Sequence, residues 1–206
     1  GTIKRIVGEA SKKGIVIQEA ARQKLDELSQ TKNHQGVIAF ASAHDYSTIE
    51  DILENAAVRG EEPFIIVMDG ITDPHNLGAV IRTAECAGAH GIIIPKRRSV
   101  GLTAVVAKTS AGAVEYMPVA KVTNISATID LLKSRGIWVA ATDMKGENYF
   151  KADLGGPIAL VIGSEGDGVG RLVKEKCDFT VSIPMYGNIT SLNASVAAGL
   201  IMYEVV

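Results

Sequence analysis

The chain has 206 residues, of which 47% are hydrophobic and 21% charged, which is enough apolar material to fill one large domain or a large domain with a small partner. The formal net charge of −2 argues against an overall basic nucleic-acid binder, so any contact with RNA or DNA must come from a local patch. Two distant cysteines, Cys86 and Cys177, favour neither a disulfide framework nor a zinc site. No apolar run approaches the roughly 20 residues that span a bilayer and no signal-like segment opens the sequence, so we expect a cytoplasmic protein without membrane contact.

The first 60 residues alternate short apolar runs with polar stretches of helical character. They predict a small α/β unit of two strands and two helices, in chain order Gly14–Gln18, Glu19–Ser29, Gly36–Ala41 and Thr48–Arg59. The turn-rich segment Gly60–Pro63 follows and is the expected domain boundary. The sequence therefore predicts one domain over residues 1–60 and a second over residues 61–206.

From residue 64 onward, apolar strands alternate regularly with helices. The predicted strands are Phe64–Met68, Gly91–Ile94, Val114–Pro118, Ile137–Ala141, Ile158–Ile162 and Thr180–Ile183. The predicted helices are Asn76–Ala87, Leu102–Ser110, Ile125–Ser134, Val169–Lys176 and Leu192–Val206. This alternation is typical of a mostly parallel sheet covered by helices on both faces. In such sheets, ligands bind beyond the carboxyl ends of the strands.

Polar residues gather in three places where a predicted strand ends and a predicted helix begins. The first cluster runs from Asp69 to Ala84 and includes Asn76, at the start of the helix, and Arg82, in its second turn. Taken alone, Asn76 fits an ordinary N-cap equally well, and Arg82 fits a surface ion pair. His75 is interpreted as a turn residue, because nothing in the sequence places a carboxylate or a nucleophile beside it.

The second cluster, Gly163–Gly170, has four glycines in eight residues, which let the backbone approach a ligand closely. Their spacing is not the G-x-G-x-x-G of a dinucleotide site, so an NAD-dependent dehydrogenase is disfavoured. Glu165 among these glycines fits a solvated loop carboxylate equally well. The third cluster, Ile183–Ser195, is a loop that leads into an apolar helix. Ser191 and Asn193 crowd the start of that helix, where they either cap it or join its free N–H groups in binding a polar ligand.

Together, the three clusters resemble the ordered motifs of the SpoU (TrmH-like) RNA 2′-O-ribose methyltransferases of the SPOUT class. The resemblance covers Phe64 to Val206 and rests on Asn76, Gly78, Arg82-Thr83-Ala84, Ile162–Gly166, Ile183-Pro184-Met185 and Ser191–Ala197. Ala194 departs from the valine of many members, but a small apolar residue serves the same packing role. The first 60 residues are similar to the L30e-like substrate-binding domain of the ribosomal RNA branch, with its first strand and helix missing.

The resemblance implies a SPOUT α/β-knot fold, in which the closing segment threads through the loop of the second cluster as a deep trefoil knot. It implies S-adenosylmethionine as the cofactor, no metal, and a homodimer packed through the closing helix. The cofactor-binding residues that it implies are Thr142, Gly163, Ile183, Met185 and Leu192. It assigns the ribose 2′-hydroxyl to Arg82, and the orientation of this hydroxyl and the substrate to Asn76, Glu165, Ser191 and Asn193.

Ribose methylation requires RNA and excludes DNA, because DNA has no 2′-hydroxyl. Lys96, Arg97 and Arg98 follow the predicted strand Gly91–Ile94, and we expect them to contact phosphates, with a solvated loop as the alternative. The N-terminal unit favours 23S rRNA, with a guanosine as the target. The alternatives are a tRNA 2′-O-methyltransferase or a resistance-type rRNA methylase of the same family and, from a different class, a non-catalytic RNA-binding module.

Overall fold

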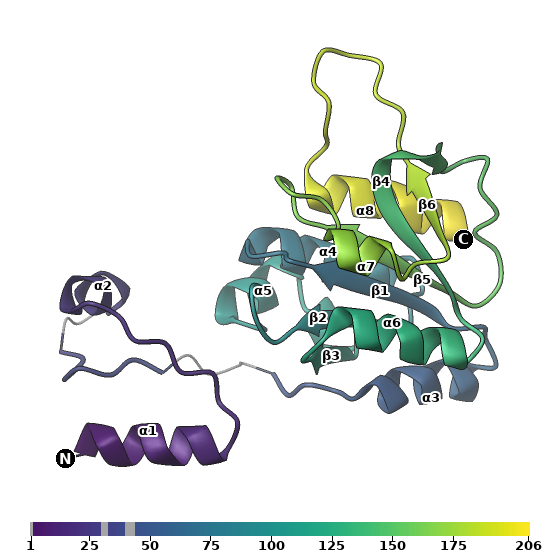
Figure 1. Ribbon diagram of the computed structural model, residues 1–206. Helices are drawn as coiled ribbons and strands as arrows, with labels where there is room; N and C mark the ends of the chain where they lie inside the picture. Colours follow the sequence, from purple (N-terminus) through teal and green to yellow (C-terminus); the bar gives the residue numbers. More distant parts are fainter. Residues whose placement is uncertain (1, 30–32, 40–43) are drawn as a thin grey trace. The chain divides into compact units, whose positions relative to one another are not determined.

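The computed structural model describes residues 2–29, 33–39 and 44–206, and the chain separates into two compact units (Figure 1). The smaller unit covers residues 1–41 and the larger one residues 42–206. This division falls before the predicted joint at Gly60–Pro63, because helix α3 (Ile49–Arg59) packs in the larger unit. Its Ile52 side chain is fully buried in a core cluster that includes residues of the sheet. The assignment of residues 1–60 to substrate binding stays a prediction.

The described residues of the smaller unit form two helices, α1 (Thr2–Lys12) and α2 (Arg22–Leu28). Helix α2 lies within the predicted helix Glu19–Ser29. The strand predicted at Gly14–Gln18 is wrong, and residues 36–39 of the second predicted strand form none either, while its last two residues lie outside the described part. An apolar run becomes a strand only where another strand satisfies its backbone, and the described residues of this unit offer no such partner.

The larger unit is built on one sheet in which every paired strand is parallel. Among the described residues its order is β3-β2-β1-β5-β4-β6. The strands are β1 (Phe64–Asp69), β2 (Gly91–Pro95), β3 (Val119–Val122), β4 (Trp138–Asn148), β5 (Ile158–Gly163) and β6 (Phe179–Ser182). All of β5 and nearly all of β1 are buried, which explains their continuous apolar sequences. The predicted parallel sheet is confirmed.

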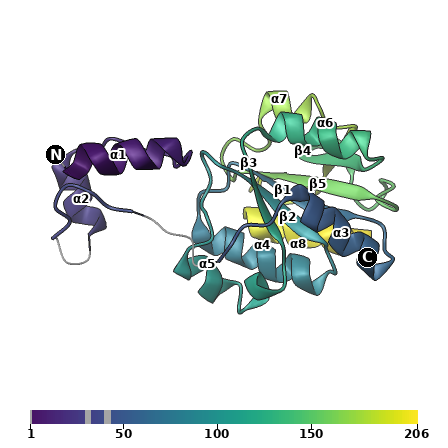
Figure 2. The ribbon, with the colours of Figure 1, turned by 90° about the horizontal axis from the view of Figure 1, so that it is seen from below.

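Helices cover both faces of this sheet (Figure 2). On one face lie α4 (Pro74–Cys86), α5 (Ala104–Thr109) and α8 (Ala194–Val205). On the other face lie α3, α6 (Ile125–Ser134) and α7 (Arg171–Lys174). Each set buries its apolar side chains against its own face of the sheet, so the larger unit has a core on each side. In the described parts of the chain, no helix combines the length and the apolar character that crossing a lipid bilayer requires.

The segment predicted as the strand Val114–Pro118 begins instead as a short 3₁₀ turn, Ala113–Glu115, and the strand follows as β3. Gly112, which precedes the turn, has a φ of +88°, a left-handed conformation that suits glycine. The apolar side chains of Val114 and Met117 are then buried in the core on the α4 face. A short apolar run fits a strand and a buried helical turn equally well, so periodicity could not separate the two.

His90 is buried at the amino-terminal edge of the sheet, with its side chain 2% exposed. Its Nδ1 accepts a hydrogen bond from the Phe64 N–H at 3.0 Å, so this nitrogen is unprotonated. Its Nε2 lies 3.0 Å from Glu61 Oε2, which also pairs with Arg59 Nη2 at 2.6 Å. Burial lowers the pKa of His90 and outweighs the opposing effect of the Glu61 hydrogen bond. The neutral ring therefore links β1 to the segment that follows α3.

We expect this histidine to make stability fall in mild acid. A lowered pKa in the folded state means that His90 contributes its full stability above its unfolded pKa of about 6.5, and that this contribution is lost as the pH falls towards the folded pKa. Urea unfolding between about pH 7.5 and pH 5 should show this fall in the free energy of unfolding, and His90→Gln should show a smaller one. Equal pH dependence in the two proteins would contradict the assignment.

Candidate functional site

The carboxyl ends of β1 and β5 lie side by side, because these strands pair along their whole length up to Asp69 and Gly163. The chain leaves β1 and enters α4 through Asp73, whose side chain accepts a hydrogen bond from the His75 N–H at 2.9 Å. Asp73 is therefore the N-cap of α4, the role considered for Asn76. Asn76 lies in the first turn of the helix, so its side chain is available for other contacts.

The side chains of Asn76, Glu165 and Asn193 form one hydrogen-bonded group, which we name the Asn76–Glu165–Asn193 cluster. Asn76 Nδ2 donates to Glu165 Oε1 at 3.0 Å. Asn193 Nδ2 donates to Asn76 Oδ1 at 2.9 Å and also to Glu165 Oε1. The Ala194 N–H donates to the same carboxylate oxygen at 3.3 Å. Residues from all three polar segments of the sequence therefore meet in space.

Asn193 also begins helix α8. Its Oδ1 accepts hydrogen bonds from the Ser195 N–H at 3.0 Å and from the Val196 N–H at 3.3 Å. The amide oxygen thus caps the helix while the amide nitrogen binds the cluster, a division that only a side chain with both a donor and an acceptor allows. Ser191 is exposed, and within the described residues its side chain has no hydrogen bond, so the structure does not bring it into the cluster.

Glu165 is held in place by a loop that folds back on itself. Ser164 and Gly168 exchange backbone hydrogen bonds of 3.2 and 3.0 Å. A Cβ at Gly163 would lie 2.0 Å from the Gly168 carbonyl carbon and 2.2 Å from the Val169 nitrogen, so only glycine fits there. The glycine to which the family resemblance assigns cofactor contact is therefore required first by the closure of its own loop.

A cleft of about 560 Å³ opens beside the cluster, between the loops after β1 and β5 and the end of β2. Asn76 and Glu165 contribute to its lining, and so do Arg97 and Arg98, whereas Lys96 does not. The cleft therefore combines two guanidinium groups with an amide and four carboxylates, because Asp69, Asp73 and Asp167 also line it. The guanidinium groups can pair with a phosphate, and the amide and the carboxylates can accept hydrogen bonds from a ligand.

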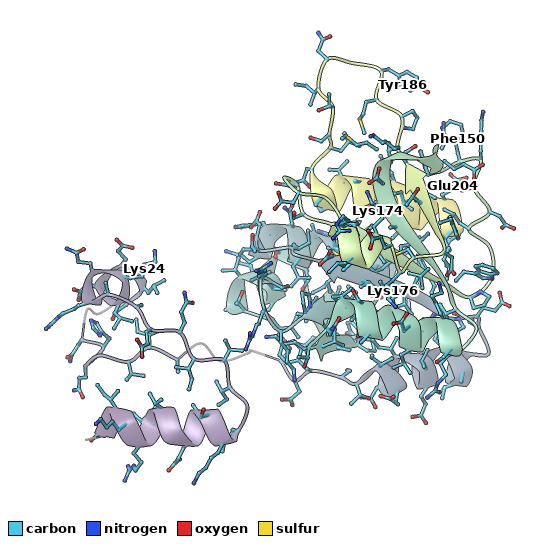
Figure 3. All side chains as sticks on the ribbon, viewed as in Figure 1. Lys24, Phe150, Lys174, Lys176, Tyr186 and Glu204 are labelled. Atoms are coloured by element: carbon cyan, nitrogen blue, oxygen red, sulfur yellow. The ribbon has the colours of Figure 1, made fainter. Side chains whose placement is uncertain are left out.

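None of the five expected cofactor-binding residues, Gly163 included, lines this cleft. Thr142, on β4, donates a hydrogen bond to the Val161 carbonyl at 3.1 Å and so joins two strands. Ile183, Met185 and Leu192 belong to the segment between β6 and α8, which projects from the sheet with Tyr186 towards its tip (Figures 1 and 3). This segment makes no backbone–backbone hydrogen bonds from residue 183 to 192 among the described residues. Its peptide groups are therefore available to a ligand.

Asp143, the residue after Thr142 on β4, forms an ion pair with α7. Lys174 Nζ, labelled in Figure 3, lies 2.5 Å from Asp143 Oδ2. The hydrogen bond from Lys174 lowers the pKa of Asp143, with a smaller contribution from the Lys145 N–H. Asp143 is therefore a charged structural partner that fixes α7 to β4, and it is not poised as a base near pH 7.

Arg82 is exposed on α4 and, as far as the described residues show, makes neither a hydrogen bond nor an ion pair. It lies six residues after Asn76, which places its backbone about 9 Å further along the helix axis. It is not part of the cleft lining. Gly199 of α8 packs beside the next residue of α4, because a Cβ there would lie 3.6 Å from Thr83 Cγ2. The structure thus places Arg82 on the same helix as the cluster but not in contact with it.

Two aspartates of the site were missed by the sequence interpretation. Asp73 caps α4, and the Asp-Pro pair at residues 73 and 74 was an available signal, because proline is favoured in the first helical turn. Asp69 Oδ2 accepts a hydrogen bond from the Gly170 N–H at 2.8 Å and so ties β1 to the far end of the glycine-rich loop. No local pattern reveals this second contact, since its partners are 101 positions apart.

Comparisons with known proteins identify this arrangement. Residues 63–203 match the model of the SpoU rRNA methylase family, and residues 1–47 match a model described as RNA 2′-O ribose methyltransferase substrate binding. The parallel sheet with helices on both faces is the fold of the SpoU/SPOUT methyltransferases among the solved structures. The chain belongs to the SpoU rRNA methylase family.

Individual relatives agree with this assignment. The chain is 53% identical over 206 residues to YacO of Bacillus subtilis, a TrmH family tRNA/rRNA methyltransferase by name, and 46% identical to a protein of the same description from Staphylococcus saprophyticus. Both matches cover 100% of this chain and 82% of the relative. The SpoU methyltransferase AviRb from Streptomyces viridochromogenes, solved in complex with AdoMet, is 34% identical with a TM-score of 0.68, over 75% of this chain and 60% of that chain. The predicted family, fold class and enzyme class are confirmed.

The two roles of Asn193 can be tested separately, because its amide oxygen caps α8 and its amide nitrogen binds the cluster. Asn193→Ala removes the cap and the cluster bonds, and should lower the free energy of unfolding by about 2 kcal/mol, of which about 1 kcal/mol comes from the cap. Asn193→Ser retains a capping oxygen but has no amide nitrogen, so it should lose only about 1 kcal/mol in the same urea experiment. Equal losses in the two variants would mean that the cap contributes nothing.

Proposed function

We propose that this protein transfers a methyl group from S-adenosylmethionine to a ribose 2′-hydroxyl of ribosomal RNA, with a guanosine of 23S rRNA as the target. The observation that carries the proposal is the Asn76–Glu165–Asn193 cluster. It joins three segments of the family's motifs at the edge of an arginine-lined cleft. The similarity of residues 1–47 to a substrate-binding model supports an RNA substrate. We expect the enzyme to act in the cytoplasm.

The residues present fit the proposed cofactor. The backbone groups of residues 183–192 form no backbone–backbone hydrogen bonds in the described chain. The same segment carries the apolar side chains of Ile183, Met185 and Ile189. Asn148, which pairs with the last residue of β6, has a buried Oδ1 without a hydrogen-bond partner. Free peptide groups, apolar side chains and an unpaired acceptor suit a purine-bearing ligand. When bound, the sulfonium supplies an already activated methyl group.

The protein then has to position the ribose and stabilise the charge that develops on its 2′-oxygen. A guanidinium is a poor base, so we assign Arg82 to a phosphate of the target nucleotide and to the forming alkoxide. The 2′-hydroxyl proton would leave through phosphate or water. Asn76, Glu165 and Asn193 hold the edge of the site rigid, and Ser191 adds a hydroxyl from the projecting segment.

RNA binding is assigned to the cleft and its rim. Arg97 and Arg98 line the cleft and would pair with phosphates, while Lys96 would act from outside it. The relatives' names include both tRNA and rRNA, so a tRNA 2′-O-methyltransferase is the second candidate. The family model matched by residues 1–47 favours the larger ribosomal substrate, since a separate substrate-binding unit extends the contact with RNA.

A homodimer is part of the proposal. Helix α8 exposes Val196, Leu200 and Tyr203, which are spaced by four and three residues and therefore form one apolar stripe. A second copy of this helix would cover the stripe, because an isologous interface pairs the same surface with itself. Arg82 lies on α4, beside α8, so such a dimer would bring it close to the partner surface.

The experiment that tests the proposed function is methyl transfer to RNA with an Arg82→Lys variant beside the wild type. The wild type should bind S-adenosylmethionine in calorimetry and methylate 23S rRNA at one ribose, and Arg82→Lys should lose nearly all turnover while keeping its cofactor affinity. High activity of Arg82→Lys would remove Arg82 from the reaction centre. Cofactor binding without transfer to any RNA would contradict the proposed reaction, and absence of cofactor binding would favour a non-catalytic RNA-binding module.

Charge removal at the cleft gives an independent prediction. If three phosphate contacts are lost, Lys96/Arg97/Arg98→Ala should flatten the plot of log K against log salt by roughly 2 units. RNA affinity measured at several salt concentrations tests this. Lys133/Arg135→Ala, at the end of α6 near the amino-terminal edge of the sheet, is the control and should leave the slope unchanged. An unchanged slope in the triple variant would show that this patch does not contact RNA.

A further inference from the structure

Tyr46 lies outside every polar cluster of the sequence, yet its side chain contacts the segment that presents the cleft arginines. We name this segment, Lys96–Leu102, the arginine loop. The Leu102 N–H donates a hydrogen bond to Tyr46 Oη at 2.9 Å. Lys121 on β3 donates to the same oxygen at 3.4 Å and lies 4.7 Å from the centre of the tyrosine ring. The hydroxyl thus joins the end of the arginine loop to the edge strand of the sheet.

The fit between Tyr46 and the loop is close. A Cβ at Gly101 would lie 2.7 Å from Tyr46 Oη and 3.3 Å from Lys121 Nζ, so a side chain at this position would push the loop away from the tyrosine. Tyr46 itself is partly buried and packs against the core on the α4 face. The contact is therefore a packed one and not a chance meeting of surface groups.

The backbone that carries Tyr46 is also fixed. Ser47, the next residue, forms a parallel bridge with Ala120 of β3, and its N–H donates to the Val119 carbonyl at 2.9 Å. Thr48 and Asp51 then form a capping box that starts α3. Tyr46 therefore projects from a segment that is tied to the sheet on one side and to a helix on the other.

Two further hydrogen bonds hold the arginine loop. The Lys96 N–H donates to the Val122 carbonyl at 2.7 Å, and the Val100 N–H donates to the Ile71 carbonyl at 2.9 Å. Between these anchors Arg98 has a φ of +56°, a left-handed conformation that residues with a side chain rarely adopt. Such a conformation persists only where its surroundings enforce it. The anchors at residues 96, 100 and 102 supply that enforcement.

We infer that Tyr46, together with Lys121, is a positioning residue that holds Arg97 and Arg98 in the geometry in which they bind RNA. The inference rests on the proposed function, since it takes the two arginines as RNA contacts. Removing the hydroxyl takes this acceptor from the Leu102 N–H and so weakens one of the three anchors of the loop. The arginines then have to be ordered when RNA binds, which weakens binding. The Asn76–Glu165–Asn193 cluster is held by its own hydrogen bonds, so cofactor binding and the transfer step stay unchanged.

Trypsin provides a direct test, because it cleaves after Lys96, Arg97 and Arg98. Tyr46→Phe should raise the rate of cleavage in the arginine loop severalfold over the wild type, while cleavage after Arg135 stays the same, as followed by mass spectrometry. Tyr116→Phe is the matched control, because Tyr116 is 79% exposed and its hydroxyl has no hydrogen bond among the described residues. Equal cleavage of the loop in Tyr46→Phe and the wild type would overturn the inference whether or not the protein methylates RNA.

Kinetics separate positioning from a general loss of structure. Tyr46→Phe should raise KM for 23S rRNA by roughly 3- to 10-fold with kcat nearly unchanged. This change in KM corresponds to the net free energy of one hydrogen bond. Adding Tyr46→Phe to Arg97/Arg98→Ala should have little further effect, because the tyrosine acts through those arginines. Fully additive effects would overturn the inference. A wild type that transfers no methyl group would count against the proposed function alone, since the trypsin result still decides the role of Tyr46.

Discussion

The oxygen Oε1 of Glu165 accepts hydrogen bonds from Asn76, Asn193 and the Ala194 N–H, and the rest of the site depends on this convergence. Its side-chain partners lie 89 and 28 positions away in the sequence. Hydrogen bonds to a charged acceptor contribute about 1.5–3 kcal/mol, too little to order three separate segments alone. They form because β1 and β5 are neighbours in a buried parallel sheet, which brings the ends of the segments together first.

The site has a rigid part and a part whose peptide groups lack backbone–backbone hydrogen bonds. The loops after β1 and β5 are closed by their own contacts, since Asp73 caps α4, Asp69 binds the Gly170 N–H, and Gly163 packs against the loop that follows it. The segment from 183 to 192 projects from the sheet and makes no backbone–backbone hydrogen bonds within the described chain. The rigid cluster is suited to holding one ligand in place, and the unpaired peptide groups are suited to forming hydrogen bonds with a second ligand beside it.

The cleft carries charges of both signs in a chain whose net charge is −2, since Arg97 and Arg98 share its lining with four acidic residues. Six lysines and arginines outside the cleft form ion pairs among the described residues, as Lys174 does with Asp143 and Lys176 with Asp130. Arg97 and Arg98 have no such partner among the described residues and line the cleft. The cleft therefore offers an anionic ligand two guanidinium groups that have no ion-pair partner in the described part of the chain.

The alternation of apolar strands and helices from residue 64 onward and the three polar segments could be predicted from the sequence, because buried strands, helix starts and glycine-rich loops all have local signatures. The other features depend on contacts between distant parts of the chain. The strand predicted at Gly14–Gln18 did not form, since a strand needs a partner that composition does not reveal. Asp73 caps α4 in place of Asn76, and Asn193 caps α8. Each capping role depends on which backbone N–H groups lie within reach of the side chain. Tyr46 acquired its place through a contact 56 positions away, and such contacts are set by packing and leave no local pattern.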